Sequence, residues 1–160
     1  MRAAWRREAT RDQAAVVAEL AALPALANCT RATLIDLVRS SRRVSLPASW
    51  PLIQEGTPGG VCYLLLDGNV EVRCHGERVA TRGPGALLGE VALLDARLRN
   101  ATVVTVTPLR VLCILFEDFS PLLARQPQLR TVLLADYERR AAESRYHSTQ
   151  PPVVPAIGQA

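Results

Sequence analysis

The spacing of apolar residues changes twice along the chain, which predicts a helical start, a β-rich centre and a helical end. Apolar residues recur with helical spacing through the first segment, predicted over residues 1–43. Pro24 interrupts this pattern and predicts two helices, the second with Asn28 or Thr30 as its N-cap. The apolar positions of the two helices are Val16, Val17, Leu20, Leu23, Leu34, Ile35, Leu37 and Val38.

The centre of the chain, residues 44–116, consists of short apolar runs separated by glycine and proline. Asp67-Gly68 and His75-Gly76 predict hairpin turns, and strands this short are typical of a sandwich or a rolled barrel. The pattern also predicts a single helical turn at residues 89–94, between two of the strands. We expect strands over residues 44–46, 52–53, 61–66, 70–73, 79–81, 101–107 and 109–116.

Helical spacing returns over residues 117–147, which predicts C-terminal helices. Phe119, Leu122 and Leu123 predict a short helix, and Pro127 suits the first position of a longer one. Residues 148–160 contain three prolines and little charge, which predicts a flexible tail. The predicted fold class is α+β: an antiparallel β-roll or jelly-roll barrel with helices at both ends.

The charge of the chain does not indicate a nucleic-acid surface. The formal net charge is +4 over 160 residues, and its positive charges come from arginine because the chain contains no lysine. Acids slightly outnumber arginines between residues 44 and 127, so the centre lacks a basic patch. Residues 148–160 are too short and too rich in proline for a helix-turn-helix, so we expect no DNA contact by this chain.

Cysteine and histidine usage argues against a metal site. The four cysteines are scattered, no C-x-x-C pair is present, and only His75 and His147 could supply nitrogen ligands. A metal-dependent enzyme of the cupin type is disfavoured for the same reason, and we expect reduced thiols in a cytoplasmic protein. Glu19 interrupts the apolar run 14–27, which favours an amphipathic helix over a secretion signal, and no apolar run reaches membrane-spanning length.

The segment from Leu88 to Arg99 carries the candidate chemistry. A helical turn that begins at Gly89 would present unpaired backbone N–H groups to an anion. The guanidinium of Arg99 matches two phosphate oxygens, and the carboxylate of Glu90 can accept a ribose hydroxyl's proton. This arrangement suits a small ligand with a phosphate at one edge and hydroxyls at the other. The alternative is an ordinary ion pair between Glu90 and Arg99, with the glycines serving only as turns.

Several motifs in order resemble the cyclic nucleotide-binding domain family. Residues 83–90 (GPGALLGE) are similar to the family's G-P-G-D-F-F-G-E, and residues 53–72 resemble its I-x-x-G-x-x-G-D-x-x-Y-x-I-x-x-G-x-V-x-V hairpin. Residues 88–102 resemble its phosphate-binding cassette, F-G-E-x-A-L-L-x-x-x-P-R-A-A-T. The resemblance implies a regulatory domain that binds a cyclic nucleotide, cAMP or else cGMP, and catalyses no reaction. It implies no other cofactor.

The resemblance also assigns roles to individual positions. It implies that Glu90 holds the ribose hydroxyl, that Arg99 holds the cyclic phosphate, and that Gly89 lets the backbone approach the ligand. It also implies that residues 117–147 form a hinge and a lid, with Arg139 at a position over the purine, although a solvated helix charge is an equal alternative for Arg139. The remaining implied contacts are the backbone amides of Val91, Ala92, Asn100 and Ala101 and the side chains of Val72 and Leu88.

Four positions depart from the family pattern, and three of them, Gly60, Leu98 and Asn100, motivate a second hypothesis. Gly60 replaces an aspartate, Leu98 replaces a proline, residues 87–88 replace an aromatic pair, and Asn100 replaces the usual small residue or threonine. The alternative function is therefore a structural or interaction module that keeps the fold and binds no nucleotide. Under the sensor hypothesis, the flanking helices transmit binding to an effector domain or protein.

Overall fold

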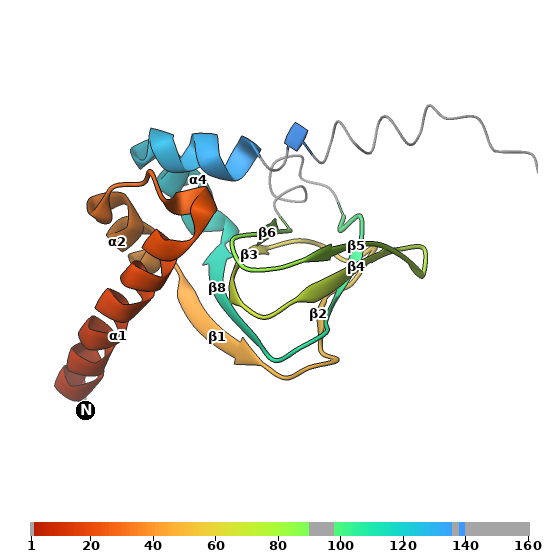
Figure 1. Cartoon of the computed structure of the whole chain (residues 1–160), viewed down its shortest axis with the longest axis horizontal. Helices are drawn as coiled ribbons and strands as arrows, with labels where there is room; N and C mark the ends of the chain where they lie inside the picture. The colour runs from red at the N-terminus through yellow and green to blue at the C-terminus, as the bar shows by residue number, and fades with distance from the viewer. Residues whose placement is uncertain (1, 90–97, 136–137, 140–160) are drawn as a thin grey trace, which may run out of the picture.

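The computed structural model describes residues 2–89, 98–135 and 138–139, with side chains described from residue 12 onward (Figure 1). Helices lie at one side of a roll of two sheets. The described elements are α1 (Arg2–Ala22), η1 (Pro24–Leu26), α2 (Arg31–Arg39), β1 (Arg42–Leu46), β2 (Pro51–Ile53), β3 (Val61–Asp67), β4 (Val70–Cys74), β5 (Glu77–Arg82), β6 (Leu87–Leu88), β7 (Thr102–Thr105), β8 (Leu109–Leu115) and α4 (Phe116–Arg125). Residues 127–135 are also helical.

The N-terminal helices form where the apolar spacing predicts them. α1 ends two residues before Pro24, which opens the short 3-10 helix η1. Of the two predicted caps, Thr30 is the N-cap of α2, because its hydroxyl oxygen accepts a hydrogen bond from the Thr33 amide at 3.2 Å. The buried residues of α2 include Leu34 and Leu37, as the helical stripe predicts.

The strands form two four-stranded antiparallel sheets, which confirms the predicted roll. Sheet A has the order β1-β8-β3-β6, and sheet B has the order β2-β7-β4-β5. In the described part of the chain no strand joins the two sheets into a closed barrel. Gly68 turns between β3 and β4 at a φ of +91°, and a Cβ there would lie 2.3 Å from the Pro108 carbonyl oxygen, so only glycine fits this hairpin.

The strand boundaries depart from the prediction where local patterning is weak. β6 is only two residues long and has no alternation to detect, yet Leu87 and Leu88 pair with β3. β1 begins at Arg42 rather than Val44, since the charged residues at its start still pair with β8. β7 is shorter than the predicted run 101–107.

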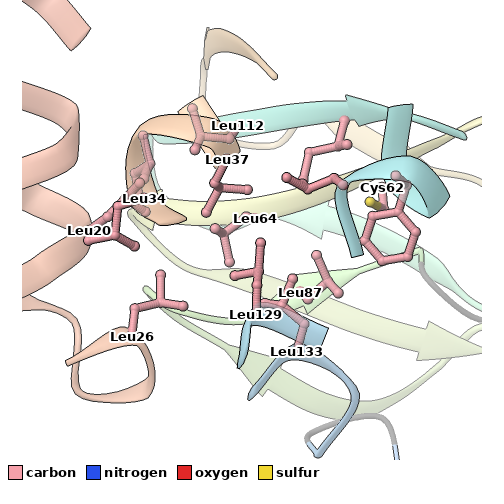
Figure 2. Close-up of a cluster of buried hydrophobic side chains, with 14 of the residues drawn as sticks. Leu20, Leu26, Leu34, Leu37, Cys62, Leu64, Leu87, Leu112, Leu129 and Leu133 are labelled. Atoms are coloured by element: carbon pink, nitrogen blue, oxygen red, sulfur yellow. The ribbon is translucent and has the colours of Figure 1, made fainter. Parts of the chain in front are cut away.

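Alternation along the strands separates the core into two clusters. The outer cluster lies between sheet A and the helices, where Leu64 and Leu112 pack with residues such as Leu20, Leu37 and Leu129 (Figure 2). The inner cluster lies on the opposite strand faces and lines the inside of the roll. Its buried members are Ile53, Leu65, Val70, Leu88, Val103, Leu109 and Val111.

Polar contacts fasten the helices to the sheet and to each other. The guanidinium of Arg110 on β8 donates two hydrogen bonds of 2.8 Å to the Glu19 carboxylate on α1. Arg125 at the end of α4 forms an ion pair of 3.0 Å with Asp36 on α2. No described helix is long and apolar enough to cross a membrane.

Candidate functional site

The two ends of the predicted cassette meet just after β6, where Arg99 binds the Gly89 carbonyl. Leu88 ends β6 with its side chain 2% exposed in the inner cluster, and Gly89 follows with a φ of +83°. Arg99 returns ten residues later and is only 8% exposed. Glu90, Val91 and Ala92, which are predicted to bind the ligand, lie outside the described residues.

Backbone carbonyls hold the Arg99 guanidinium. Nη1 donates to the Gly89 carbonyl oxygen at 2.8 Å, and Nη2 donates to the Val61 carbonyl oxygen at 2.5 Å. A Cβ at Gly89 would lie 2.2 Å from Nη1, so the missing side chain makes room for this arrangement. Gly89 therefore serves Arg99 as well as the backbone turn that the sequence predicts.

The loop before β3 fixes the backbone of Arg99. The Arg99 amide donates to the Thr57 carbonyl oxygen at 2.8 Å, and the Gly56 amide donates to the Arg99 carbonyl oxygen at 2.8 Å. Leu98, which replaces the family's proline, forms an isolated antiparallel bridge with Pro58. In the family pattern, a proline at position 98 would restrict the backbone before the arginine. In this chain, hydrogen bonds to the loop hold the backbone of Arg99 instead.

The charge of Arg99 has no acidic partner within the described residues. None of their carboxylates forms an ion pair with it, and Gly60 stands where the family pattern carries an aspartate. Carbonyl oxygens satisfy part of the guanidinium's hydrogen-bonding capacity without neutralising its charge. A buried cation in this state favours an anionic ligand, because an opposite charge lowers the cost of its burial.

The residues after Arg99 contact the β4–β5 hairpin. The Cys74 thiol donates to the Asn100 carbonyl oxygen at 3.6 Å, and burial raises the pKa of this thiol. The Glu55 amide donates to the Thr102 hydroxyl at 3.0 Å, while the Glu55 carboxylate accepts the His75 amide at 2.9 Å. The start of β7 is thus tied to both the β2–β3 loop and the β4–β5 turn.

The other predicted contact residues differ in their placement. Val72 is half-buried and packs against the inner cluster, of which Leu88 is a buried member. Ala101 is half-buried, whereas Asn100 and Arg139 are exposed. The structure therefore brings Leu88, Gly89 and Arg99 together, and the position of Arg139 over a ligand stays a prediction.

The sequence gives no signal for the backbone groups at this site. Val61 and Thr57 contribute carbonyl oxygens, which every residue type possesses, so no side-chain motif marks them. The nearest feature that the sequence offers is Gly60, which precedes Val61 and stands where the family pattern has an aspartate. Among the described residues, no group of three His, Cys, Asp or Glu side chains could hold a metal ion.

Comparison with known proteins identifies the family. Residues 43–126, which are more than half of the chain, match the family described as the cyclic nucleotide-binding domain. The chain belongs to this family. The resemblance carried by the hairpin and cassette motifs is thereby confirmed.

Relatives of this cyclic nucleotide-binding domain include channels and regulators. The cyclic nucleotide-gated potassium channel mll3241 of Mesorhizobium japonicum is 31% identical over 124 residues, covering 77% of this chain and 34% of the channel. The cyclic AMP receptor protein of Thermus thermophilus is 35% identical over 116 residues, covering 69% of this chain and 54% of that protein. The chain thus spans about a third to a half of the length of these relatives.

A solved structure supports the same assignment. The crystal structure of the Thermus thermophilus catabolite activator protein superposes with a TM-score of 0.69 at 29% identity. The match covers 78% of this chain and 61% of that one. The two-sheet roll with its flanking helices is therefore the fold of the cyclic nucleotide-binding domain family.

Proposed function

We propose that this chain is a regulatory domain that binds a cyclic nucleotide, with cAMP as the first candidate and cGMP as the second, and that it catalyses no reaction. The observation that carries this proposal is the buried Arg99 guanidinium at the junction of β3 and β6. It has a positive charge, a fixed position and no carboxylate partner among the described residues. A relative named for cyclic AMP supports the choice of ligand.

Arg99 would bind the cyclic phosphate through charge-assisted hydrogen bonds. The guanidinium has five N–H donors, and the structure shows carbonyl oxygens accepting from Nη1 and Nη2, which leaves donors for phosphate oxygens. Backbone amides of Val91, Ala92, Asn100 and Ala101 would complete the anion site, and Glu90 would bind the ribose hydroxyl. Val72 and Leu88 would contact the base or ribose from the inner cluster.

Ligand binding would act on an effector through the helices. Arg125 and Gln126 both bind the Asp36 carboxylate, with the Gln126 amide nitrogen at 3.0 Å, so α2 and the end of α4 are joined. Movement of one would therefore displace the other. Binding shifts such an equilibrium only by the difference in affinity between two conformations, so contacts from the lid, including Arg139, would matter as much as contacts to the phosphate.

Isothermal titration calorimetry with cAMP and cGMP tests this function. Removing one member of a buried charged pair costs about 2–5 kcal/mol, so Arg99→Ala should weaken binding by roughly 30-fold to several-thousand-fold. Arg31→Ala is the matched control, because it removes the same charge from an exposed position at the start of α2. An unchanged Kd for Arg99→Ala would remove Arg99 from the site.

The alternative is a module that retains the fold without a ligand. The same carbonyl contacts favour it, since they hold Arg99 in place without a phosphate. A thermal-shift assay separates the two functions, because ligand at a hundred times its Kd stabilises a protein by about 2.7 kcal/mol. If neither cAMP nor cGMP raises the Tm at millimolar concentration, the chain is such a module.

A further inference from the structure

Tyr63 lies in the middle of sheet A, beside the groups that hold Arg99. It pairs with Leu88 on β6 and with Cys113 on β8, and its side chain packs against the inner cluster. The ring is therefore on the face of β3 that lines the inside of the roll. Within the described part of the chain, its phenol hydroxyl has no hydrogen-bond partner.

The Arg99 guanidinium links β3 to Gly89, the residue that follows β6. One carbonyl that it binds belongs to Val61, two residues before Tyr63 on the same strand and about 7 Å away along it. The other belongs to Gly89, the residue after Leu88, which pairs directly with Tyr63. The phenol thus extends from the strand pair to which the guanidinium is bound, and the Arg99 charge is close enough to lower the pKa of Tyr63 in part.

We propose that Tyr63 is a second phosphate-binding residue, which donates its phenol hydroxyl to the cyclic phosphate beside Arg99. This inference rests on the proposed function and adds to it a side chain that neither the cassette nor its spacing includes. The half-buried phenol gains a hydrogen-bond acceptor when the ligand binds, and the phosphate gains a donor from β3.

The chemistry of the phenol fits this role. Burial raises the pKa of Tyr63, and the positive charge of Arg99 opposes the increase only in part, so the hydroxyl keeps its proton at neutral pH and can donate. A neutral donor also places no second positive charge beside the guanidinium. A bond from a half-buried hydroxyl to a charged oxygen is stronger than one between neutral groups.

Tyr63→Phe tests the inference, because it removes the hydroxyl and keeps the ring. We expect calorimetry to show binding weaker by about 10-fold to 100-fold, the range for a hydrogen bond to a charged group. The loss should be equal for cAMP and cGMP, because the two ligands share the phosphate and differ in the base. The ³¹P resonance of bound cAMP should also shift between the wild-type protein and Tyr63→Phe.

Cys113→Ala is the matched control, since it changes the cross-strand neighbour of Tyr63 on the same face of sheet A. It should leave the Kd within a few-fold of the wild type and the ³¹P resonance unchanged. An equal loss of affinity in both variants would mean that this row acts through packing and would overturn the inference. A loss in Tyr63→Phe that affects cAMP or cGMP alone would also overturn it, because the hydroxyl would then contact the base.

The wild-type titration separates this inference from the function on which it rests. If the wild-type chain binds cAMP or cGMP and Tyr63→Phe binds with the same Kd, only the role of Tyr63 is wrong. If the wild-type chain binds neither ligand, both proposals are wrong. Thermal unfolding of each variant without ligand shows whether the roll itself has changed.

Discussion

The two faces of sheet A differ in what covers them. On the outer face, aliphatic side chains such as Leu64 and Leu112 are fully covered by the helices (Figure 2). On the inner face, Leu65 and Val111 are equally buried, but Tyr63 and Cys113 on the same strands are only half-buried. One face is thus closed by the protein itself, and the other keeps polar groups accessible near Arg99.

This difference suggests a division of roles between the two faces, if the proposed ligand binds on the inner one. Successive side chains point to opposite faces, so β3 contributes Cys62 and Leu64 to the outer cluster and Tyr63 and Leu65 to the inner side. Apolar burial stabilises the fold on both sides, but only the inner side also keeps half-buried polar groups. If the inner face is the binding face, substitutions on the outer side should lower stability alone, and substitutions on the inner side should lower both stability and affinity.

Leu64→Ala and Leu65→Ala provide the strongest test of this comparison. Both leucines are 0% exposed and adjacent on β3, so each variant should lose about 2–5 kcal/mol of unfolding free energy through the cavity it creates. Only Leu65→Ala should also weaken cyclic nucleotide binding, by several-fold, because its cavity lies inside the roll. Urea denaturation and calorimetry measure the two effects. Equal Kd values for the two variants would contradict the assignment of faces.

Gly89→Ala should have the next largest effect. A φ of +83° costs a side-chain-bearing residue about 1–2 kcal/mol, and the new Cβ would displace the Arg99 guanidinium. We expect nucleotide affinity to fall by at least about 10-fold, the lower end for the loss of one charge-assisted hydrogen bond.

Gly76→Ala is the matched control for Gly89→Ala. Gly76 has the same φ of +83°, but a Cβ there would meet nothing within 4 Å. It should therefore show the backbone cost in urea denaturation with an unchanged Kd. A similar loss of affinity in both variants would show that backbone strain, rather than the position of Arg99, controls binding.

Val72→Ala tests the comparison of inner and outer faces on sheet B, where we expect a smaller loss of stability and affinity. The half-buried Val72 packs against the inner cluster, so its truncation should cost about 1 kcal/mol of stability and weaken binding a few-fold. Val104→Ala on the neighbouring strand β7 is the control, because Val104 alternates with the inner Val103 and is also half-buried. If Val104→Ala weakens binding as much, Val72 makes no specific contact.

Asp36→Asn should have the smallest effect, and that effect should depend on pH. Hydrogen bonds from Arg125 and Gln126 hold the pKa of Asp36 below its ordinary value. The carboxylate therefore stabilises the fold above its unfolded pKa of about 3.9, and this contribution disappears as the pH falls through the lower folded value. We expect a Tm about 2 °C below the wild type at pH 7.

The difference in Tm between Asp36→Asn and the wild type should become smaller below pH 4. Thermal unfolding of both proteins across pH 3–7 measures this difference. Glu77→Gln, an exposed substitution on β5, is the control and should show no such dependence. A difference that stays constant with pH would mean that the Asp36 charge is not involved.

Local patterns predicted most of the elements but not the contacts between them. The turn at Asp67-Gly68, the cap at Thr30 and the apolar stripe of α4 each depend on a few adjacent residues. The strand β6 was missed because two residues carry no periodicity, and its pairing with β3 decides its conformation. The Glu90 contact and the roles assigned to individual cassette residues stay predictions.

The sequence alone determined the order of helices and strands, and it pointed to the family through several motifs in the right order: the hairpin of residues 53–72, the turn of residues 83–90 and the cassette of residues 88–102. Only the tertiary structure decided which groups contact Arg99 and which residue pairs with Tyr63. The Arg99 guanidinium contacts a carbonyl 38 residues earlier in the chain, and Tyr63 lies opposite Leu88 because β3 pairs with β6 in one register. Backbone carbonyls carry no residue-type signal, and strand register depends on burial across the whole sheet, so neither contact can be derived from local sequence.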